Sequence, residues 1–543
     1  MEVAVVTVRT HRKSGQAGPD HETVVLGAGP GGICAGVLLK RRSLDNFVIL
    51  ERADEVGGTW RDNDYPGIGV DVPGFMYQYS FARNPRWSRL FPKGAQVKAY
   101  HQQVADDFGL MPHLRFGVNV VREIWDEAAQ WWRLECDDGS VISTRFLISA
   151  VGAFMEPKKD AGIPGLDDFV GKILSPTDWD HSYDLTDKNI AVIGTGASSV
   201  QITPSIAPGV KQLDVYQRTP VWCLPKPDMA MPPRLQRILA GSVVGAGLTG
   251  MSLLALDLAV RSIIFTPLAA FGPFARRFDN AARWAYRAYL ARVVRDQSDR
   301  AALAPAYGLF GKRPTFSNAF LQTFNRANVS LVTSPIVKVT PHAIETGDGR
   351  IRPTDALVLA TGYEMFSDPE SYRTGAIVGR NGFDLGRFYT DQGLQAYQSV
   401  ALPGLPNRWM LIGPYSWTGT GWHAMVEISA GHAVRVIEEA MRRDAHSVAV
   451  REQAHSDYHR GIIKRGRNVK HYFTSVNEGL RTYYVNSQGD VPFIRPSSIF
   501  SARRSGTHVK FEDYDFTPRV TSTRSTEGWR GSASRRVNDE ATA

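Results

Sequence analysis

One pattern constrains the fold more than any other, and it occurs twice: a short apolar strand, a glycine-rich turn and an apolar helix. The first copy has a strand at Thr23–Leu26 and continues into GAGPGG, and the second has a strand at Ile190–Ile193 and continues into GTGASS. In such a turn the first glycine makes the bend, the second lets the backbone approach a pyrophosphate, and the third position packs the helix on the strand. The candidate cofactor-binding residues are Gly27, Gly29, Pro30 and Gly32 in the first turn, and Gly194, Thr195, Gly196, Ser198 and Ser199 in the second. The chain is therefore expected to bind two dinucleotides.

The residues that follow the second strand of each unit indicate which dinucleotide is bound. The strand Phe47–Leu50 is followed by Glu51 and Arg52, and a carboxylate at this position accepts from a ribose hydroxyl. The strand Leu213–Gln217 is followed instead by Arg218, whose guanidinium suits the 2′-phosphate of NADP(H). A solvated charge at a strand end is the alternative for Arg218. Two such sites suggest hydride transfer from a mobile nicotinamide to a bound flavin.

Alternating strand and helix patterns place the chain in the α/β class, with two Rossmann-like dinucleotide-binding domains. We expect a first dinucleotide-binding domain at 21–160 that resumes at 366–513, and a second, for NADP(H), at 161–365. A helical insertion at about 225–305 interrupts the second domain, and we expect it to shape a large, apolar substrate pocket. The ends, 1–20 and 514–543, have little to bury and are expected to be disordered.

Composition excludes several other classes of protein. The net charge of +9 comes from 63 basic and 54 acidic residues that are spread along the chain, so a nucleic-acid partner is not expected. Three cysteines, Cys34, Cys136 and Cys223, have no CxxC spacing, which argues against a disulfide framework, a zinc site and a dithiol redox pair. The first residues contain no signal-peptide core. A cytoplasmic location is expected, whereas the sequence gives no indication of oligomeric state.

One segment raises the question of a membrane. Residues Ile238–Leu256 carry no charge and reach the roughly 18 to 20 residues that a spanning helix needs. A second apolar run, Ser262–Phe274, follows them. We favour buried or tunnel-lining helices over peripheral membrane contact through 238–274, and peripheral contact over a true span.

Further motifs give the chain a resemblance to class B flavoprotein monooxygenases, specifically the Baeyer-Villiger monooxygenases and the related flavin-containing monooxygenases. The resemblance covers most of residues 21–504. It rests on GGTW at 57–60, NDYPG at 63–67, QRTPVW at 217–222, GKRP at 311–314, FNRANV at 324–329 and ATGY at 360–363. It implies that the first unit holds FAD and the second holds NADPH.

The resemblance also implies roles for single residues. Those expected to line the FAD are Gly58, Thr59, Trp60, Asp71 and Tyr77, with Gly413 in a Gly-Pro turn beside the flavin. Those expected to contact the NADP phosphate are Arg218 and Thr219, with Lys312 nearby. Arg313 matches the active-site arginine of the family, and Asp71 would hold it in place, so these two are the predicted catalytic residues. A solvated turn is the alternative for Lys312 and Arg313, and a turn aspartate is the alternative for Asp71.

Two features leave the chemistry open. The segment FVGKILSPTDW at 169–179 is similar to the family fingerprint FxGxxxHxxxW, but Ser175 stands where the fingerprint has histidine, and serine does not carry positive charge. Trp417, Trp422, His423 and Met425 are candidates for lining the substrate pocket, although aromatic residues are found more often in a core.

The resemblance implies a monooxygenase that uses FAD, NADPH and O2 to insert one oxygen atom into a small organic substrate through a C4a-peroxyflavin. Baeyer-Villiger oxidation of a ketone to an ester or lactone is the main prediction, because Arg313 would stabilise the negative charge that develops on oxygen. The alternatives are oxygenation of amines or sulfides, and an FAD- and NADPH-binding redox protein without productive oxygenation. No residue pattern identifies the substrate.

Overall fold

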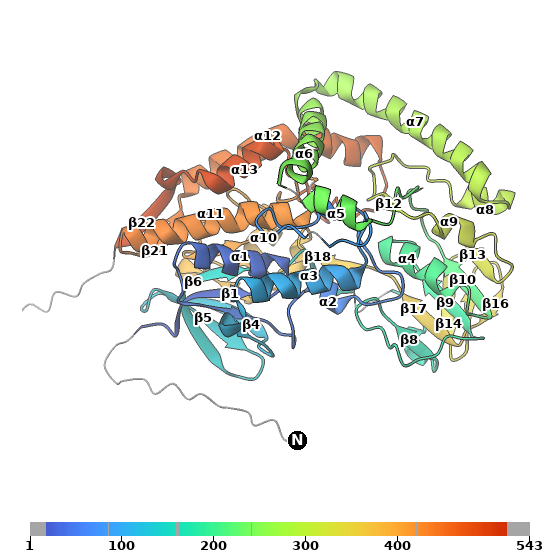
Figure 1. Ribbon diagram of the computed structural model, residues 1–543, viewed down its shortest axis with the longest axis horizontal. Helices are drawn as coiled ribbons and strands as arrows, with labels where there is room; N and C mark the ends of the chain where they lie inside the picture. Colours follow the sequence, from blue (N-terminus) through green and yellow to red (C-terminus); the bar gives the residue numbers. More distant parts are fainter. Residues whose placement is uncertain (1–17, 85, 159–161, 241, 420, 519–543) are drawn as a thin grey trace, which may run out of the picture.

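The computed structural model describes residues 18–84, 86–158, 162–240, 242–419 and 421–518. The expected disorder of residues 1–17 and 519–543 lies outside these described residues. Two sheets, one mixed and one parallel, carry the two glycine-rich turns, and a layer of long helices lies above them in Figure 1. The two sheets are described first, because they position the cofactor sites.

The first sheet has the strand order β19-β4-β5-β6-β1-β2-β3, with β20 paired to β6. Its strands are β1 (His21–Leu26), β2 (Phe47–Leu50), β3 (Leu114–Arg115), β4 (Val120–Asp126), β5 (Trp131–Cys136), β6 (Val141–Ser149), β19 (Ile377–Val378) and β20 (Arg408–Met410). Strands β6, β1, β2 and β3 run parallel, whereas β4 and β5 form an antiparallel hairpin that continues into β6. The predicted strand Phe47–Leu50 is confirmed, and β1 begins two residues earlier than predicted.

Helices cover both faces of this sheet because its strands are buried on both sides. Val25 and Ile49 pack against α1 (Pro30–Arg41), α3 (Gly94–Asp107) and α11 (Trp422–Arg442). Their neighbours Val24 and Val48 point the other way and share a core with α10 (Leu385–Gln392). This alternation follows from the period of two residues in a strand.

The second sheet is entirely parallel, with the order β13-β10-β9-β17-β8. Its strands are β8 (Lys172–Leu174), β9 (Asn189–Ile193), β10 (Gln212–Tyr216), β13 (Val329–Val332) and β17 (Ala356–Leu359). Helices α4 (Ala197–Ile206) and α9 (Phe320–Thr323) share a core with one face. The three-stranded sheet β14 (Ile336–Thr340), β15 (Ala343–Thr346) and β16 (Ile351–Pro353) lies against the other. The prediction of two Rossmann-like units in an α/β chain is confirmed.

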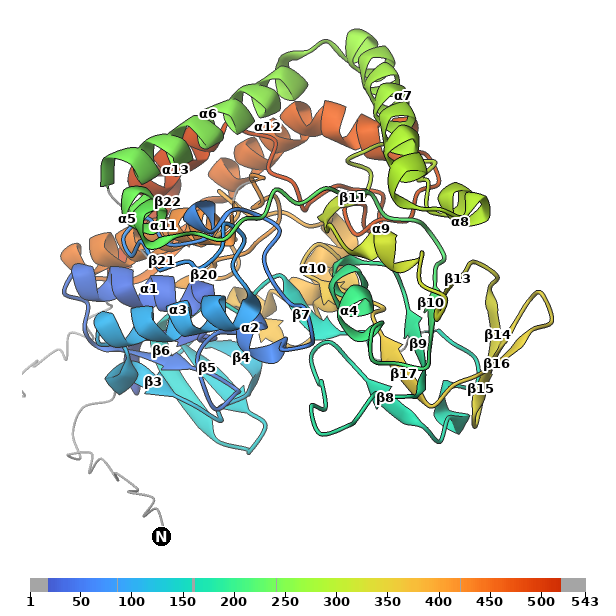
Figure 2. The same ribbon diagram turned by 45° about the vertical axis from the view of Figure 1, so that its right-hand side comes forward.

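The helical layer is built from segments far apart in the sequence (Figures 1 and 2). It contains α5 (Pro233–Ala240), α6 (Ser242–Phe265), α7 (Leu268–Val293), α8 (Gln297–Ala302), α12 (Glu452–His471) and α13 (Ile499–Thr507). Helix α6 packs on α12 and α13 with one side only, and 17% of its most apolar stretch is buried. The prediction of a buried helix is therefore wrong for α6, because one narrow side of a helix is enough to hold it on the protein.

Short pairings join the remaining segments. They are β7 (Phe154–Pro157) with β18 (Tyr363–Met365), β11 (Cys223–Leu224) with β12 (Thr315–Phe316), and β21 (Ala445–Val450) with β22 (Tyr514–Pro518). The last pair corrects the expectation that disorder begins at residue 514. Tyr514 is buried and its hydroxyl lies 2.7 Å from Nε2 of His432. The first residues of the expected tail are therefore ordered by contacts that could not be predicted from their composition.

Candidate active site

The first glycine-rich turn has the backbone geometry that its sequence predicts. Gly27 has φ of +96°, and a Cβ there would lie 2.9 Å from the carbonyl oxygen of Ala150. A Cβ on Gly32 would lie 1.8 Å from the oxygen of Gly27, so helix α1 approaches the turn too closely for any side chain. Gly29 caps α1 and Pro30 occupies its first turn. Free backbone N–H groups at this helix start suit a pyrophosphate.

Glu51 lies at the end of β2, where a ribose-binding acid is expected. It is 8% exposed, and its Oε2 accepts from the backbone N–H of Ala28 at 2.6 Å. Its Oε1 accepts from the N–H of Ala53 at 3.0 Å. These bonds fix the carboxylate beside the glycine-rich turn. Arg52 forms an ion pair with Glu156, so its charge is already matched within the protein.

A second glycine packs directly against the first turn. Gly58 caps the short helix α2 (Thr59–Asp62), and a Cβ built on Gly29 would lie 3.4 Å from the Cα of Gly58, so the two backbone segments approach each other without side chains between them. Further along the chain, Nε1 of Trp60 donates to the Tyr77 hydroxyl at 3.0 Å. The structure thus brings Gly29 and Gly58 together, and Trp60 and Tyr77 together.

Asp71 and Arg313 form the ion pair that the resemblance implies. Oδ2 of Asp71 lies 3.5 Å from Nη2 of Arg313, and the Asp71 side chain is 8% exposed. Burial raises the pKa of Asp71, although Arg313 and Lys226 favour its charged form. The Arg313 side chain is 41% exposed, so burial opposes its charge only in part, and the neighbouring Asp71 raises the pKa of that guanidinium above its ordinary value. Arg313 therefore keeps a positive charge.

This pair lies where the two nucleotide-binding units meet. Gly69, two residues before Asp71, exchanges backbone hydrogen bonds with the Gln201 side chain on α4 of the second unit. Arg313 has Tyr77 and Tyr483 among its neighbours. A cation at this boundary is close to elements of both cofactor sites.

The second glycine-rich turn repeats the first. Gly194 has φ of +107° and a Cβ there would lie 2.6 Å from the oxygen of Ala360, while Gly196 caps α4 and has no heavy atom within 4 Å of its Cβ position. Thr195 donates through its hydroxyl to the oxygen of Thr219 at 3.1 Å. Ser199 is buried, as the third position requires, whereas Ser198 lies next to Tyr65. The open space at Gly196 fits the pyrophosphate of NADP.

Two cations adjoin this second turn. Arg218 follows β10 and is exposed, and Lys312 lies close enough that burial and the charge of Arg218 lower the Lys312 pKa. Nζ of Lys312 also lies 5.8 Å from the centre of the Tyr307 ring. Two neighbouring cations repel each other unless an anion lies between them, so the pair suits a phosphate.

The sequence did not predict the partner of His423. Nε2 of His423 on α11 lies 2.9 Å from Nε2 of His101 on α3, and both side chains are fully buried. The Tyr77 ring packs edge-on against His423 with ring centres 4.7 Å apart. His101 lies on the apolar side of an amphipathic helix, and this position in the sequence pattern could have predicted that His101 is buried. His423 and Met425 are buried, as the core alternative expects, whereas Trp417 and Trp422 are partly exposed.

Two other predicted positions lie in turns. A Cβ on Gly413 would lie 2.3 Å from the oxygen of Ser399, so this position is closely packed. Ser175 follows β8, and its hydroxyl lies 3.1 Å from that of Thr177. The backbone of Ser175 pairs with Asp178, and Trp179 packs in the core of the second unit. The turn keeps its structure without the fingerprint histidine.

Taken together, two dinucleotide turns, a buried acid at the first and a pair of cations at the second define an oxidoreductase that uses FAD and NADP. The three cysteines are buried and unpaired, and no group of metal-ligating side chains occurs among the described residues. These facts agree with a flavoprotein that has no dithiol centre.

Comparisons with known proteins narrow this class. The pyridine nucleotide-disulphide oxidoreductase family matches residues 24–244. A Baeyer-Villiger monooxygenase of Streptomyces coelicolor is 37% identical over 413 residues, which cover 75% of this chain and 76% of the relative. A solved structure of oxidized steroid monooxygenase bound to NADP is 25% identical with a TM-score of 0.77, covering 92% of this chain and all of that one. A structure of OTEMO complexed with FAD and NADP has a TM-score of 0.78 at 22% identity, covering 92% of this chain and all of that one, and supports the fold. The chain belongs to the Baeyer-Villiger monooxygenases, and it is an NADPH-dependent flavin monooxygenase that takes a small organic substrate and O2.

Proposed function

We propose that Arg313 and Asp71 are the catalytic pair of a Baeyer-Villiger oxidation that converts a ketone into an ester or lactone. The observation that carries this assignment is the buried carboxylate of Asp71, 3.5 Å from a guanidinium at the boundary of the two cofactor units. In the overall reaction one atom of O2 enters the C–C bond beside the carbonyl and the other leaves as water. Bound FAD supplies the activation of O2, and NADPH supplies the two electrons.

Arg313 acts through its fixed positive charge. Negative charge develops on oxygen as the ketone carbonyl is attacked, and a preorganised cation stabilises that charge more than solvent does. Asp71 holds the guanidinium in one orientation and keeps it protonated. A neutral sulfide or amine nucleophile does not pass through an alkoxide, so this arrangement favours ketones over the amine and sulfide alternatives.

The cofactor contacts are proposed from the same geometry. The residues that would hold FAD are Gly27, Gly29, Pro30, Gly32, Glu51, Arg52, Gly58, Thr59, Trp60, Asp71, Tyr77 and Gly413. Those that would hold NADP are Gly194, Thr195, Gly196, Ser198, Ser199, Arg218, Thr219 and Lys312. The buried, unpaired cysteines support a reducing, cytoplasmic location for the enzyme.

The test is oxygen transfer by the purified holoenzyme to a panel of ketones, sulfides and amines. Ester formed, NADPH consumed and hydrogen peroxide released are measured together for the wild type and for Arg313→Ala. We expect ketone turnover in the wild type, and peroxide with almost no ester in the variant. Full ester formation by Arg313→Ala would refute the role of Arg313. A wild type that oxidises sulfides or amines but no ketone would refute the proposed reaction.

A further inference from the structure

Helix α6 exposes an apolar side along most of its length. The exposed large side chains are Val243, Val244, Leu248, Met251, Leu254, Leu258, Ile263 and Phe265, with exposed fractions between 38% and 82%. The surface continues over the next helix and the loop beside it through Leu268, Phe274, Phe278, Trp284 and Phe310. We call these residues the α6–α7 surface. It lies at the outer edge of the molecule in Figures 1 and 2. Apolar residues gathered in this way mark a surface that meets a protein or a lipid.

The inner side of α6 is bound firmly to the protein. Asp257 is 1% exposed, pairs with Arg261 and accepts from the backbone N–H of Ile499 at 2.6 Å. At the end of α6, Nδ2 of Asn468 donates to the carbonyl oxygens of Ile263 and Thr266 at 2.6 and 2.7 Å. A helix held by these polar contacts cannot leave the protein to cross a bilayer without exposing them. The helix therefore fits contact with a bilayer surface rather than a span.

The charged residues of helices α5 to α7 favour an anionic partner. Residues 233–293 contain eight arginines, at positions 234, 237, 261, 276, 277, 283, 287 and 292. The same stretch contains only two acids, Asp257 and Asp279, and each is 1% exposed. Exposed charge on these helices is therefore positive. Helices that combine exposed apolar residues, tryptophan and exposed arginines are typical of helices that lie in the interface of an anionic bilayer.

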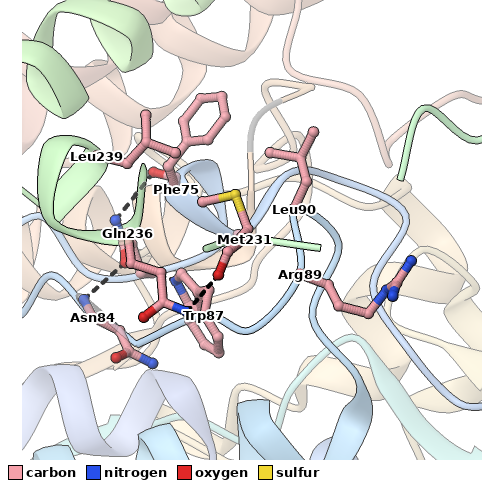
Figure 3. A pocket seen from close by; sticks show the side chains of 10 residues that line it. Phe75, Asn84, Trp87, Arg89, Leu90, Met231, Gln236 and Leu239 are labelled. Carbon is pink, nitrogen blue, oxygen red and sulfur yellow. Dashed lines mark hydrogen bonds between the residues drawn. The ribbon is translucent and has the colours of Figure 1, made fainter. Parts of the chain in front are cut away.

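Helix α6 contacts segments that adjoin the candidate active site. Leu256 of α6 packs against Gly419, where an added Cβ would lie 3.4 Å from it, and the Thr249 hydroxyl lies 3.4 Å from the oxygen of Phe75. Phe75 belongs to a short helix, η1 (Gly74–Met76), that leads directly into Tyr77. Figure 3 shows Phe75, Trp87, Met231 and Leu239 around a cavity of about 10 Å³. Helix α6 therefore touches a segment that continues into the proposed flavin site.

We propose that the α6–α7 surface docks onto an anionic lipid bilayer and that a lipophilic ketone enters the enzyme from that bilayer. The identity of the substrate as a ketone rests on the proposed function. A second copy of the chain is a poorer occupant, because a two-fold contact would bring the two sets of arginines together.

The experiment is cosedimentation of the holoenzyme with vesicles of phosphatidylcholine alone or mixed with phosphatidylglycerol. We expect binding to the mixed vesicles that weakens as the salt concentration rises, because dissolved ions screen the attraction between the arginines and the anionic lipid. The variant Met251→Asp/Leu258→Asp places two charges on exposed positions of α6 and is expected to lower the partition coefficient at least about tenfold. The matched control is Val170→Asp/Ile351→Asp, whose positions are equally exposed on the second nucleotide unit.

Three results would overturn the proposal: no binding of the wild type to the anionic vesicles, equal loss in the control variant, or a wild-type dimer that the α6 variant converts to monomer. Turnover of a small, water-soluble ketone is measured in parallel. Loss of vesicle binding with intact turnover of that ketone separates docking from chemistry. Vesicle binding without any ketone turnover would refute the proposed function instead and leave the docking surface in place.

Discussion

His101 and His423 place their Nε2 atoms 2.9 Å apart in a fully buried position beneath the Tyr77 ring. One imidazole donates to the other, and neither Nδ1 has a hydrogen-bond partner among the described residues. Burial lowers the pKa of His101 to about 3, and burial together with the neighbouring His101 lowers the pKa of His423. Both rings are therefore neutral in the folded enzyme.

This pair predicts acid sensitivity. Both pKa values lie below the ordinary 6.5. Between pH 6.5 and about 3 the unfolded chain therefore binds protons at these histidines that the folded chain does not bind. Stability then falls as pH falls, by about 1.4 kcal/mol per pH unit for each histidine. Urea unfolding at pH 7.5, 6.0 and 5.0 measures the slope. We expect His101→Gln to reduce the slope and the exposed His508→Gln to leave it unchanged; equal slopes in all three proteins would contradict this account.

Conservative changes at the ion pair should separate charge from geometry. Arg313→Lys keeps the positive charge but removes the guanidinium group that faces Asp71. Asp71→Asn removes the negative charge that faces Arg313. Loss of one preorganised electrostatic contact typically lowers kcat about 10²- to 10³-fold. We expect that loss in ester formation, with NADPH oxidation continuing and peroxide replacing ester. The exposed Arg350→Lys serves as the control, and a fall in NADPH oxidation equal to the fall in ester would point to a damaged cofactor site.

Cofactor choice should depend on the two cations beside the second turn. Arg218→Ala and Lys312→Ala each remove a charge proposed to face the 2′-phosphate. A hydrogen bond to a charged group contributes about 1.5–3 kcal/mol, so KM for NADPH should rise about tenfold or more in each variant. KM for NADH should change little, because NADH has no 2′-phosphate. An equal rise for both cofactors would show that these residues support the fold of the site and not the phosphate.

The glycines of the second turn allow a test of binding that leaves the fold intact. A Cβ on Gly196 meets no protein atom within 4 Å, and Gly196 has an ordinary negative φ. Gly196→Ala should keep the melting temperature of the wild type but weaken NADP⁺ binding several-fold, measured by calorimetric titration. Gly209→Ala, at an exposed position of the same unit, is the control. Unchanged NADP⁺ affinity in Gly196→Ala would place the pyrophosphate elsewhere.

Local patterns predicted the elements that carry the cofactor turns. Strands β2 and β9 and both glycine-rich turns follow from short runs of apolar residues and from positions where a side chain has no room. The ion pair of Asp71 and Arg313 is different, since the two residues are 242 positions apart and came from family resemblance. The sequence alone does not show which two distant residues come into contact.

The errors arise where tertiary packing decides the outcome. The composition of α6 is equally compatible with a core helix and a surface helix, and only its neighbours α12 and α13 determine which side is covered. The sequence left His423 open between a pocket and the core, because its partner, His101, lies on a helix more than 300 residues away. Residues 514–518 lack an apolar run, yet they pair with β21 because a free strand edge is available there.

The two glycine-rich turns have similar backbone geometry but differ in the protein segments that lie opposite them. A Cβ built on Gly29 would lie 3.4 Å from the Cα of Gly58, whereas one built on Gly196 would meet no heavy atom of the described residues within 4 Å. The first turn is thus covered on one side by a second backbone segment, while the second turn is open at the equivalent position. The flavin is accordingly expected to stay with the protein through purification and many catalytic cycles, and the nicotinamide nucleotide to exchange with the cellular pool in each.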